Sequence, residues 1–204
     1  MCPKVTSQHR EEIRGRILQS AIDCFSKNGF DRTRMDEISL SADVSKGTLY
    51  NYFNSKEDLF HALCDDSLEL LKLQLDKLFA SSKHDLIYNA ELFYENYQKI
   101  QKEGTTKVFF EALSESTRNP KLQKILFKHR LKIFKVVENY LQIQIDNGFL
   151  KGDTNPEYIA SGLVSLFDGI TAGSLLGIPE DFNKKVWSVT IRTILSTLEK
   201  DQTN

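Results

Sequence analysis

The sequence has few of the residues that mark secreted, metal-binding or membrane proteins. Its 204 residues include three cysteines, four prolines and one tryptophan. The cysteines, Cys2, Cys24 and Cys64, are odd in number and lack metal-type spacing, which favours a reducing cytoplasm over a disulfide-stabilised fold. We find no membrane span or signal peptide in the pattern, so we expect a cytoplasmic protein with no membrane partner.

An excess of charge of one sign is also absent. Lys and Arg number 27 against 28 Asp and Glu, a net charge of −1 that argues against indiscriminate binding to nucleic acid. Residues 1–57 carry nine basic and eight acidic side chains, so DNA binding must depend on where the cations lie. No nucleophile motif, phosphate loop or convincing pair of carboxylates is visible, and we predict no enzyme.

Metal-ligating side chains are sparse as well. His61 and Cys64 lie three residues apart on one helical face, and His84 could extend them into a metal site. The alternative is that these side chains simply pack, and spacing alone is a poor test of ligation. We predict no metal site and no cofactor.

What the sequence does contain is helical periodicity along its whole length. Apolar residues recur at four-residue spacing from Ile13 to Phe25, which predicts a helix over residues 10–28. No strand-like alternation and no repeat is present, so the predicted class is all-α. The other helices are expected over residues 33–42, 45–53, 55–79, 85–102, 105–117, 120–147, 156–177 and 181–200.

The short helix over residues 45–53 has one face that does not suit a core. Ser45 is a good N-cap, and Leu49 and Phe53 share the face that anchors the helix, with Tyr52 at its edge. The opposite arc presents short or rigid hydrogen-bonding groups and a glycine that permits close approach to a phosphate. These outward residues are Gly47, Thr48, Tyr50 and Asn51.

The segments on either side support this short helix. Thr33 and Asp36 have the spacing of a capping box for the preceding helix. Ser39 is small enough for close packing, and Asp43 occupies a turn position that is expected to need positive φ. Ser55 is the expected N-cap of the following long helix, where Lys56 is free to reach a DNA phosphate.

The run VSKGTLYNYFNSKEDLF resembles the N-terminal DNA-binding domain of the TetR family of transcriptional regulators, and the resemblance extends over residues 10–64. Ser39 and Asp43 depart from the family pattern, which usually has Ala and Gly there. The resemblance implies contacts to phosphates from Thr33, Tyr50, Tyr52 and Lys56, and to base edges from Arg34, Lys46, Thr48 and Asn51. Gly47 completes the implied DNA-facing set.

The implied organisation is a helix-turn-helix DNA-binding domain of three helices at residues 1–54 and a helical-bundle domain for ligand binding and dimerisation at residues 55–204. The implied function is repression: a dimer binds a palindromic, double-stranded operator until a small effector releases it. Two recognition helices must enter successive major grooves about 34–36 Å apart, so a dimer is required.

Small residues at four-residue spacing predict the subunit interface. They lie in the helix over residues 156–177, which is expected to pair with the helix over residues 181–200. The alternative is a tight helix contact within one subunit. The predicted interface residues are Ser161, Ser165, Gly169, Gly173, Trp187, Ile191, Ile194 and Leu198.

Aromatic side chains collect in the middle of the chain and predict the effector site. Helical bundles can hold apolar ligands between helices, so we expect a small hydrophobic effector around Tyr97, Phe110, Phe134 and Phe167. The alternative for each residue is an ordinary core position. A second possibility for the C-terminal domain is control by a protein partner, and a more distant one is a helical enzyme with a polar pocket.

Overall fold

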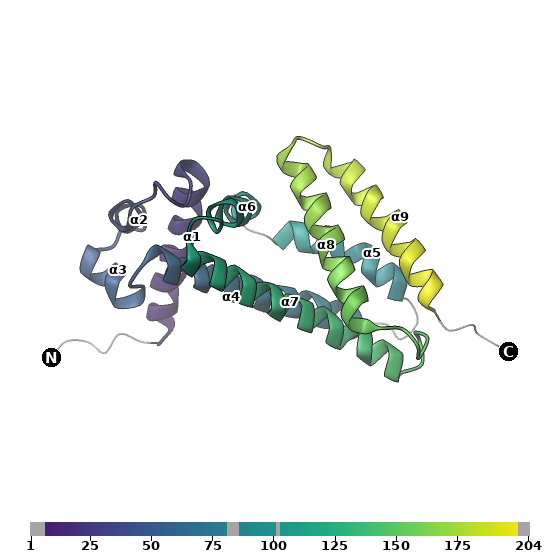
Figure 1. The fold of residues 1–204 in the computed structure, drawn as a ribbon. Helices are drawn as coiled ribbons and strands as arrows, with labels where there is room; N and C mark the ends of the chain where they lie inside the picture. Colours follow the sequence, from purple (N-terminus) through teal and green to yellow (C-terminus); the bar gives the residue numbers. More distant parts are fainter. Residues whose placement is uncertain (1–6, 81–85, 101–102, 200–204) are drawn as a thin grey trace. The chain divides into compact units, whose positions relative to one another are not determined.

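The structure is a computed structural model that describes residues 7–80, 86–100 and 103–199. The described residues form helices and turns, with one isolated β-bridge between Leu150 and Glu199 and no strand, so the predicted all-α class is confirmed. The helices of the described residues are α1 (Ser7–Asn28), α2 (Met35–Ser41), α3 (Lys46–Tyr52), α4 (Lys56–Ala80), α5 (Leu86–Ile100), α6 (Thr105–Glu115), α7 (Pro120–Asp146), α8 (Pro156–Leu175) and α9 (Glu180–Leu198), as labelled in Figure 1.

The chain divides into two compact units. The first comprises Met1–Asp66 and Lys102–Phe127, and the second comprises Ser67–Gln101 and Lys128–Asn204. The predicted domain boundary between residues 54 and 55 therefore lies inside the first unit. The long helices α4 and α7 each contribute residues to both units.

The core of the first unit forms around α1. Ile17, Leu18 and Phe25 of α1 are completely buried, as their spacing on one helical face predicts. Ile38 of α2 and Leu49 of α3 are equally buried and belong to the same cluster. α2 and α3 therefore share the core that α1 forms.

α6 also belongs to the first unit, although it lies far along the chain from α1 to α3. Val108 and Ala112 of α6 and Leu122 of α7 are buried in the cluster around α1. Before α6, Gly104 has a φ of 82°, and a Cβ added there would lie 3.0 Å from the hydroxyl oxygen of Ser26. The sequence did not indicate this packing, because an apolar stripe does not specify the core that it joins.

Aromatic side chains from α5, α8 and α9 form the core of the second unit. Tyr94 is completely buried, and its ring centroid lies 6.1 Å from that of Trp187 and 5.8 Å from that of Phe167. The indole N–H of Trp187 donates to the carbonyl of Ala90 at 2.7 Å. Burial raises the pKa of the Tyr94 phenol to about 12. These contacts pack α9 against α5 and α8 (Figure 1).

α8, with 20 residues, is the one described helix that is long and apolar enough to cross a membrane. A core helix of a soluble protein passes the same test, so this is weak evidence for a membrane span. Ala160, Leu163 and Ile170 of α8 are buried in the cluster with Tyr94 and Trp187. Packing within the second unit therefore accounts for these apolar side chains.

Asp43 allows a test of the backbone before α3. Its φ of 51° is the one positive value at a non-glycine residue in the described part of the chain, and it confirms the expected conformation. Asp43→Gly should raise the free energy of unfolding by up to about 1 kcal/mol, because glycine has no Cβ to clash there. Asp43→Ala should lower it by about 1 kcal/mol. Urea unfolding measures both, and equal midpoints for the two variants would contradict the strained conformation.

Candidate nucleic-acid interface

α3 has the capping contact that its sequence predicts. The hydroxyl oxygen of Ser45 accepts a hydrogen bond from the amide of Thr48 at 3.0 Å. At the other end Phe53 is extended, and its amide still donates to the carbonyl of Leu49 at 3.0 Å. A helix of seven residues has little stability alone, so its position depends on the side chains that it buries.

The two faces of α3 differ as predicted. Leu49 is completely buried and Phe53 is 6% exposed, whereas Tyr50 on the opposite face is 48% exposed. Thr48 and Tyr52 are half-buried. The other exposed residues of α3 are Lys46, Gly47 and Asn51. The outward side chains can therefore reach a ligand without any change in the core.

A tight turn joins α3 to α2. The amide of Val44 donates to the carbonyl of Ser39 at 3.0 Å across this turn, which contains Asp43 in the left-handed region. Ser39 is 4% exposed, and its hydroxyl donates to the carbonyl of Asp36 at 2.9 Å. A small residue at position 39 and a turn-tolerant one at position 43 therefore preserve the helix-turn-helix geometry.

The start of α2 differs from the prediction by one residue. Arg34 is the N-cap, and its amide donates to the carboxylate of Glu37 at 3.1 Å, so the capping box predicted at Thr33 is wrong. Thr33 is 1% exposed, and its hydroxyl lies 2.7 Å from the carbonyl oxygen of Gly29 and 3.1 Å from that of Cys24. Its hydroxyl fastens α2 to the end of α1. The predicted phosphate contact from Thr33 stays a prediction, although its hydroxyl proton is used within the first unit.

A shallow, open cleft of about 710 Å³ lies beside α3 in the first unit. Its walls carry three cationic side chains and the Tyr50 phenol, which are groups that bind phosphate oxygens in protein–DNA complexes. Two carboxylates at the same walls limit the net charge. The lining residues are Asp31, Arg32, Thr33, Arg34, Met35, Asp36, Tyr50 and Lys56.

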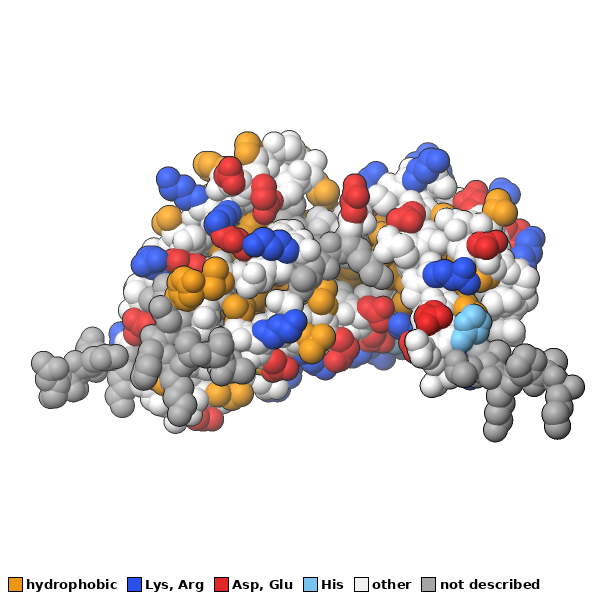
Figure 2. Space-filling view, turned by 180° about the vertical axis from the view of Figure 1, so that it is seen from behind, with side chains coloured by type: hydrophobic (Ala, Val, Ile, Leu, Met, Phe, Trp, Pro, Cys, Tyr) orange, Lys and Arg blue, Asp and Glu red, His pale blue; other side chains and the backbone are white. Residues whose placement is uncertain are grey.

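Lys46, the first residue of α3, forms an ion pair with Asp36 of α2. The Nζ–Oδ2 distance is 2.5 Å, and the two side chains are 65% and 54% exposed. An exposed pair contributes little free energy, so Lys46 can exchange this carboxylate for a DNA group at small cost. On the molecular face shown in Figure 2, basic and acidic side chains are likewise interspersed.

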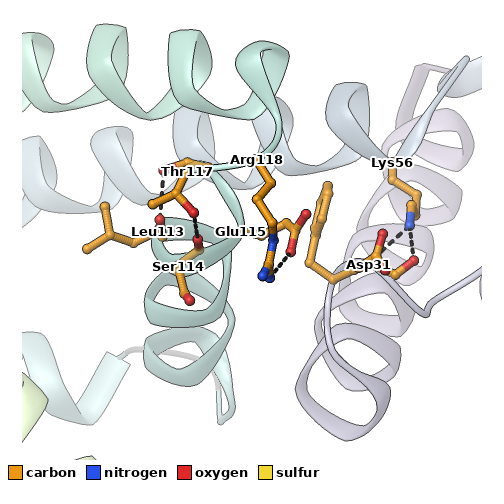
Figure 3. Close-up of polar contacts among 9 residues, drawn as sticks. Asp31, Lys56, Leu113, Ser114, Glu115, Thr117 and Arg118 are labelled. Atoms are coloured by element: carbon orange, nitrogen blue, oxygen red, sulfur yellow. Dashed lines mark hydrogen bonds and ion pairs between the residues drawn. The ribbon is translucent and has the colours of Figure 1, made fainter.

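Lys56 is fastened to the backbone of its own unit. Its ammonium donates to the carbonyl of Asp31 at 2.6 Å (Figure 3). It also donates to the carbonyl of Phe30 at 2.8 Å and lies 5.1 Å from the Phe30 ring centroid. Two of its three donors are thereby used. Lys56 is therefore not free as expected, because it ties the first turn of α4 to the corner between α1 and α2. Its contact with a DNA phosphate stays a prediction.

α4 is fastened to α1 at a second position. The guanidinium of Arg14 donates to both carboxylate oxygens of Asp66, at 2.9 and 3.4 Å. The hydrogen bond to Asp66 raises the pKa of Arg14. Two separate contacts therefore fix the first part of α4 within the unit that contains α3.

The predicted effector residues do not all lie in one unit. Tyr97, Phe134 and Phe167 belong to the second unit, whereas Phe110 belongs to the first. Tyr97 is 8% exposed, and its ring centroid lies 5.3 Å from that of Phe167 in an edge-to-face contact. Sequence proximity alone did not indicate that Phe110 joins the first unit, and its place in the effector site stays a prediction.

An ion pair that the sequence did not reveal lies among the aromatic residues of the second unit. Arg130 of α7 contacts Asp168 of α8 at 2.6 Å, and its guanidinium carbon lies 5.8 Å from the Phe134 ring centroid. Burial raises the pKa of Asp168, while Arg130 opposes that shift. The hydroxyls of Ser67 and Tyr97 are 3.4 Å apart. Charged and hydroxyl groups therefore lie beside aromatic rings in the second unit.

The predicted interface residues divide into three groups by exposure. Trp187 and Ile191 are 5% and 1% exposed, and a Cβ added at Gly173 would lie 3.0 Å from Ile178 of the same chain. These three positions pack within the second unit, as in the alternative of a contact within one subunit, and their predicted subunit contact stays a prediction. Ser165 and Gly169 are exposed on α8. The half-buried members of the set are Ser161, Ile194 and Leu198.

The metal-type residues do not gather into a site in the described part of the chain. Among these residues no group of three or more His, Cys, Asp or Glu side chains is placed to hold a metal ion. His61 lies 3.8 Å from Asp65, and Cys64 is 1% exposed. His84 lies outside the described residues.

Residues 17–63 match the family described as bacterial regulatory proteins, tetR family. The matched range contains most of α1, all of α2 and α3, and the first turns of α4. The chain is also 28% identical over 179 residues to the uncharacterized HTH-type transcriptional regulator YfiR of Bacillus subtilis strain 168, an alignment that covers 86% of each chain.

Solved structures share the fold. GusR of Salmonella enterica aligns with a TM-score of 0.75 and 24% identity over 96% of this chain and 98% of its own. SmeT in complex with triclosan aligns with a TM-score of 0.73 and 18% identity over 94% and 93% of the two chains. SmeT is described as the repressor of the Stenotrophomonas maltophilia multidrug efflux pump SmeDEF.

The two lysines beside α3 should differ in their effect on stability. Lys56→Met keeps an apolar stem near Phe30 but removes two hydrogen bonds, and should lower the free energy of unfolding by about 1.5–3 kcal/mol. The matched variant Lys46→Met removes an exposed ion pair and should change it by less than about 1 kcal/mol. Urea unfolding distinguishes the two, and equal losses would show that Lys56 is not a structural tie.

Proposed function

Because the chain belongs to the TetR family of transcriptional regulators, we propose that it is a repressor that binds a palindromic operator as a homodimer and is released by a small hydrophobic effector. It is a DNA-binding regulator with a helix-turn-helix, and like its relatives it is not an enzyme. We place its action in the cytoplasm, where operator DNA is accessible.

The observation that carries this proposal is the exposed face of α3. Leu49 and Phe53 hold the helix from one side, so Tyr50 and its neighbours are presented by an anchored element. A helix presented in this way can enter a major groove, where each base pair offers a distinct pattern of donors and acceptors. Near-zero net charge means that these local groups, rather than long-range attraction, provide the selectivity.

We assign the exposed groups two tasks. Tyr50 and Tyr52 hold α3 against backbone phosphates, and Gly47 allows the backbone to come close. Arg or Lys side chains pair well with guanine, and Asn pairs well with adenine. The residues assigned to base edges are Arg34, Lys46, Thr48 and Asn51. Thr33 and Lys56 support this surface from within the first unit.

We propose that α8 and α9 provide the dimer surface. Exposed apolar patches commonly mark interaction sites, and several large apolar side chains of these helices or their connecting turn are exposed. Nothing lies within 4 Å of a Cβ added at Gly169, so that side of α8 is open to a second copy. The exposed apolar residues are Tyr158, Leu175, Leu176, Ile178, Phe182 and Val189.

Tyr50→Ala should weaken operator binding by about tenfold or more, because one hydrogen bond to a charged phosphate contributes about 1.5–3 kcal/mol. The operator is the duplex that the parent protein selects from random sequences, and fluorescence anisotropy measures the affinity. Circular dichroism and sedimentation should show an unchanged fold and dimer. Tyr88→Ala, which removes a similarly exposed tyrosine at 52%, should bind as the parent does. Equal affinity for Tyr50→Ala and the parent would refute the assignment.

We propose that the effector binds among the aromatic residues of the second unit. Tyr97, Phe134 and Phe167 offer apolar surface, and Arg130 with Asp168 adds polar groups beside them. A small site of apolar walls with few polar groups is typical of ligand sites in helical bundles. The SmeT–triclosan complex supports this proposal, since a protein of the same fold binds a small aromatic compound.

An effector should raise the melting temperature of the full-length protein. A ligand present at 100 times its Kd stabilises the folded state by about 2.7 kcal/mol, which a thermal shift screen of apolar compounds can detect. Phe134→Ala should reduce the shift. Phe127→Ala removes an exposed phenylalanine of the first unit and should leave the shift unchanged. No shift across a broad library, or an undiminished shift in Phe134→Ala, would contradict this site.

A further inference from the structure

Asn119 joins two helices of the first unit through one side-chain amide. Its Nδ2 donates to the carboxylate of Glu57 in α4 at 3.0 Å. Its Oδ1 accepts from the amide of Leu122 at 3.1 Å, so Asn119 also caps the start of α7. Both ends of the amide group are used, and the contact to Glu57 is partly buried. Asn119 therefore links the N-termini of α4 and α7.

The first turn of α4, which contains Glu57, is a meeting point of other segments. The amide of Asn54 donates to the carboxylate of Asp58, and the amide of Asp58 donates to the hydroxyl of Ser55, each at 3.1 Å. Asn54 directly follows Phe53, the residue that ends α3. Lys56 ties the same turn to the corner between α1 and α2. The turn is thus bonded to the exit of α3 and to the α1–α2 corner as well as to α7.

We propose that Asn119 is a positioning residue for DNA recognition. Its contact with Glu57 fixes the first turn of α4, and through that turn the exit of α3, relative to the start of α7. The α7 side of the link is held by Leu122, which is completely buried in the cluster that also contains Leu49 of α3.

This assignment extends the DNA-binding machinery beyond the helix-turn-helix. Asn119 lies outside residues 17–63, which match the regulator family, and outside the expected domain at residues 1–54. It acts through Glu57 and makes no DNA contact of its own. The inference rests on the proposed recognition face of α3, whose own test is the Tyr50→Ala variant.

The hydrogen bond from Asn119 Nδ2 to the Glu57 carboxylate can be tested by variants that exchange the donor and the acceptor. Asn119→Asp keeps an oxygen that can cap α7, because Asp and Asn are equally good N-caps, but it places a carboxylate against Glu57. Glu57→Gln keeps an acceptor for Asn119. In the double variant Glu57→Gln with Asn119→Asp, the new glutamine amide can donate to the new carboxylate, so the link is restored with its polarity reversed.

The experiment measures the affinity of the full-length variants for the duplex selected by the parent protein, over a range of salt concentrations. Asn119→Asp should bind about threefold to tenfold more weakly, within the range expected for loss of one partly buried hydrogen bond. Glu57→Gln and the double variant should bind within about twofold of the parent, a smaller change than the loss of one hydrogen bond would cause. The salt dependence of Asn119→Asp should match that of the parent, because no phosphate contact is removed.

Each alternative outcome has a definite meaning. Parent-like affinity of Asn119→Asp, or a double variant as weak as Asn119→Asp, overturns the proposal, and a shallower salt dependence shows direct phosphate contact instead. If Asn119→Asp fails to fold, Asn119→Ser provides the test, because serine can cap α7 but is too short to reach Glu57; parent-like affinity of that variant overturns the proposal. A loss with Asn119→Asp but none with Tyr50→Ala refutes the assignment of Tyr50 alone, whereas a loss with Tyr50→Ala but none with Asn119→Asp overturns only the role of Asn119.

Discussion

The burial of one side of α3 is the constraint on which the rest of the first unit depends. A helix of seven residues cannot persist alone, so Leu49 and Phe53 must find a core large enough to hold it. α1 supplies the largest share of that core, and α4, α6 and the start of α7 add to it. Because Leu49 and Phe53 are buried in this core, the opposite side of α3, with Tyr50, stays exposed.

Several polar contacts of the first unit serve the same constraint. Thr33 fastens α2 to the end of α1, Lys56 fastens α4 to the α1–α2 corner, and Arg14 fastens α4 to α1 again. None of these side chains is on the exposed face of α3, yet each limits how that face can move. By contrast, the Lys46–Asp36 pair is exposed and contributes little stability, so Lys46 remains available for exchange.

Local sequence signals predicted local structure well. Ser45 caps α3, Asp43 has positive φ, and the stripe of α1 is buried, because each depends on residues within one or two turns. The capping box at Thr33 was a local error of one residue. The other differences concern partners distant in the sequence: Lys56 looked free because the carbonyls of Phe30 and Asp31 lie about 25 positions away, and the bond from Trp187 to Ala90 was not predictable from local spacing.

Connectivity limits how a ligand in the second unit could control DNA binding. α4 and α7 each contain residues of both units, and the first turns of both meet at Asn119. A shift of α4 or α7 in the second unit would therefore be transmitted along a continuous helix to that junction. An effector produces such a shift only if it binds one arrangement of the helices more tightly than the other. To reverse the populations of the two arrangements from 1:99 to 99:1, its binding free energies to them must differ by about 5.5 kcal/mol. The hydrogen bonds at that junction, about 1 kcal/mol each, are weak enough to yield to that difference, whereas the buried cluster that contains Leu49 and Leu122 is not.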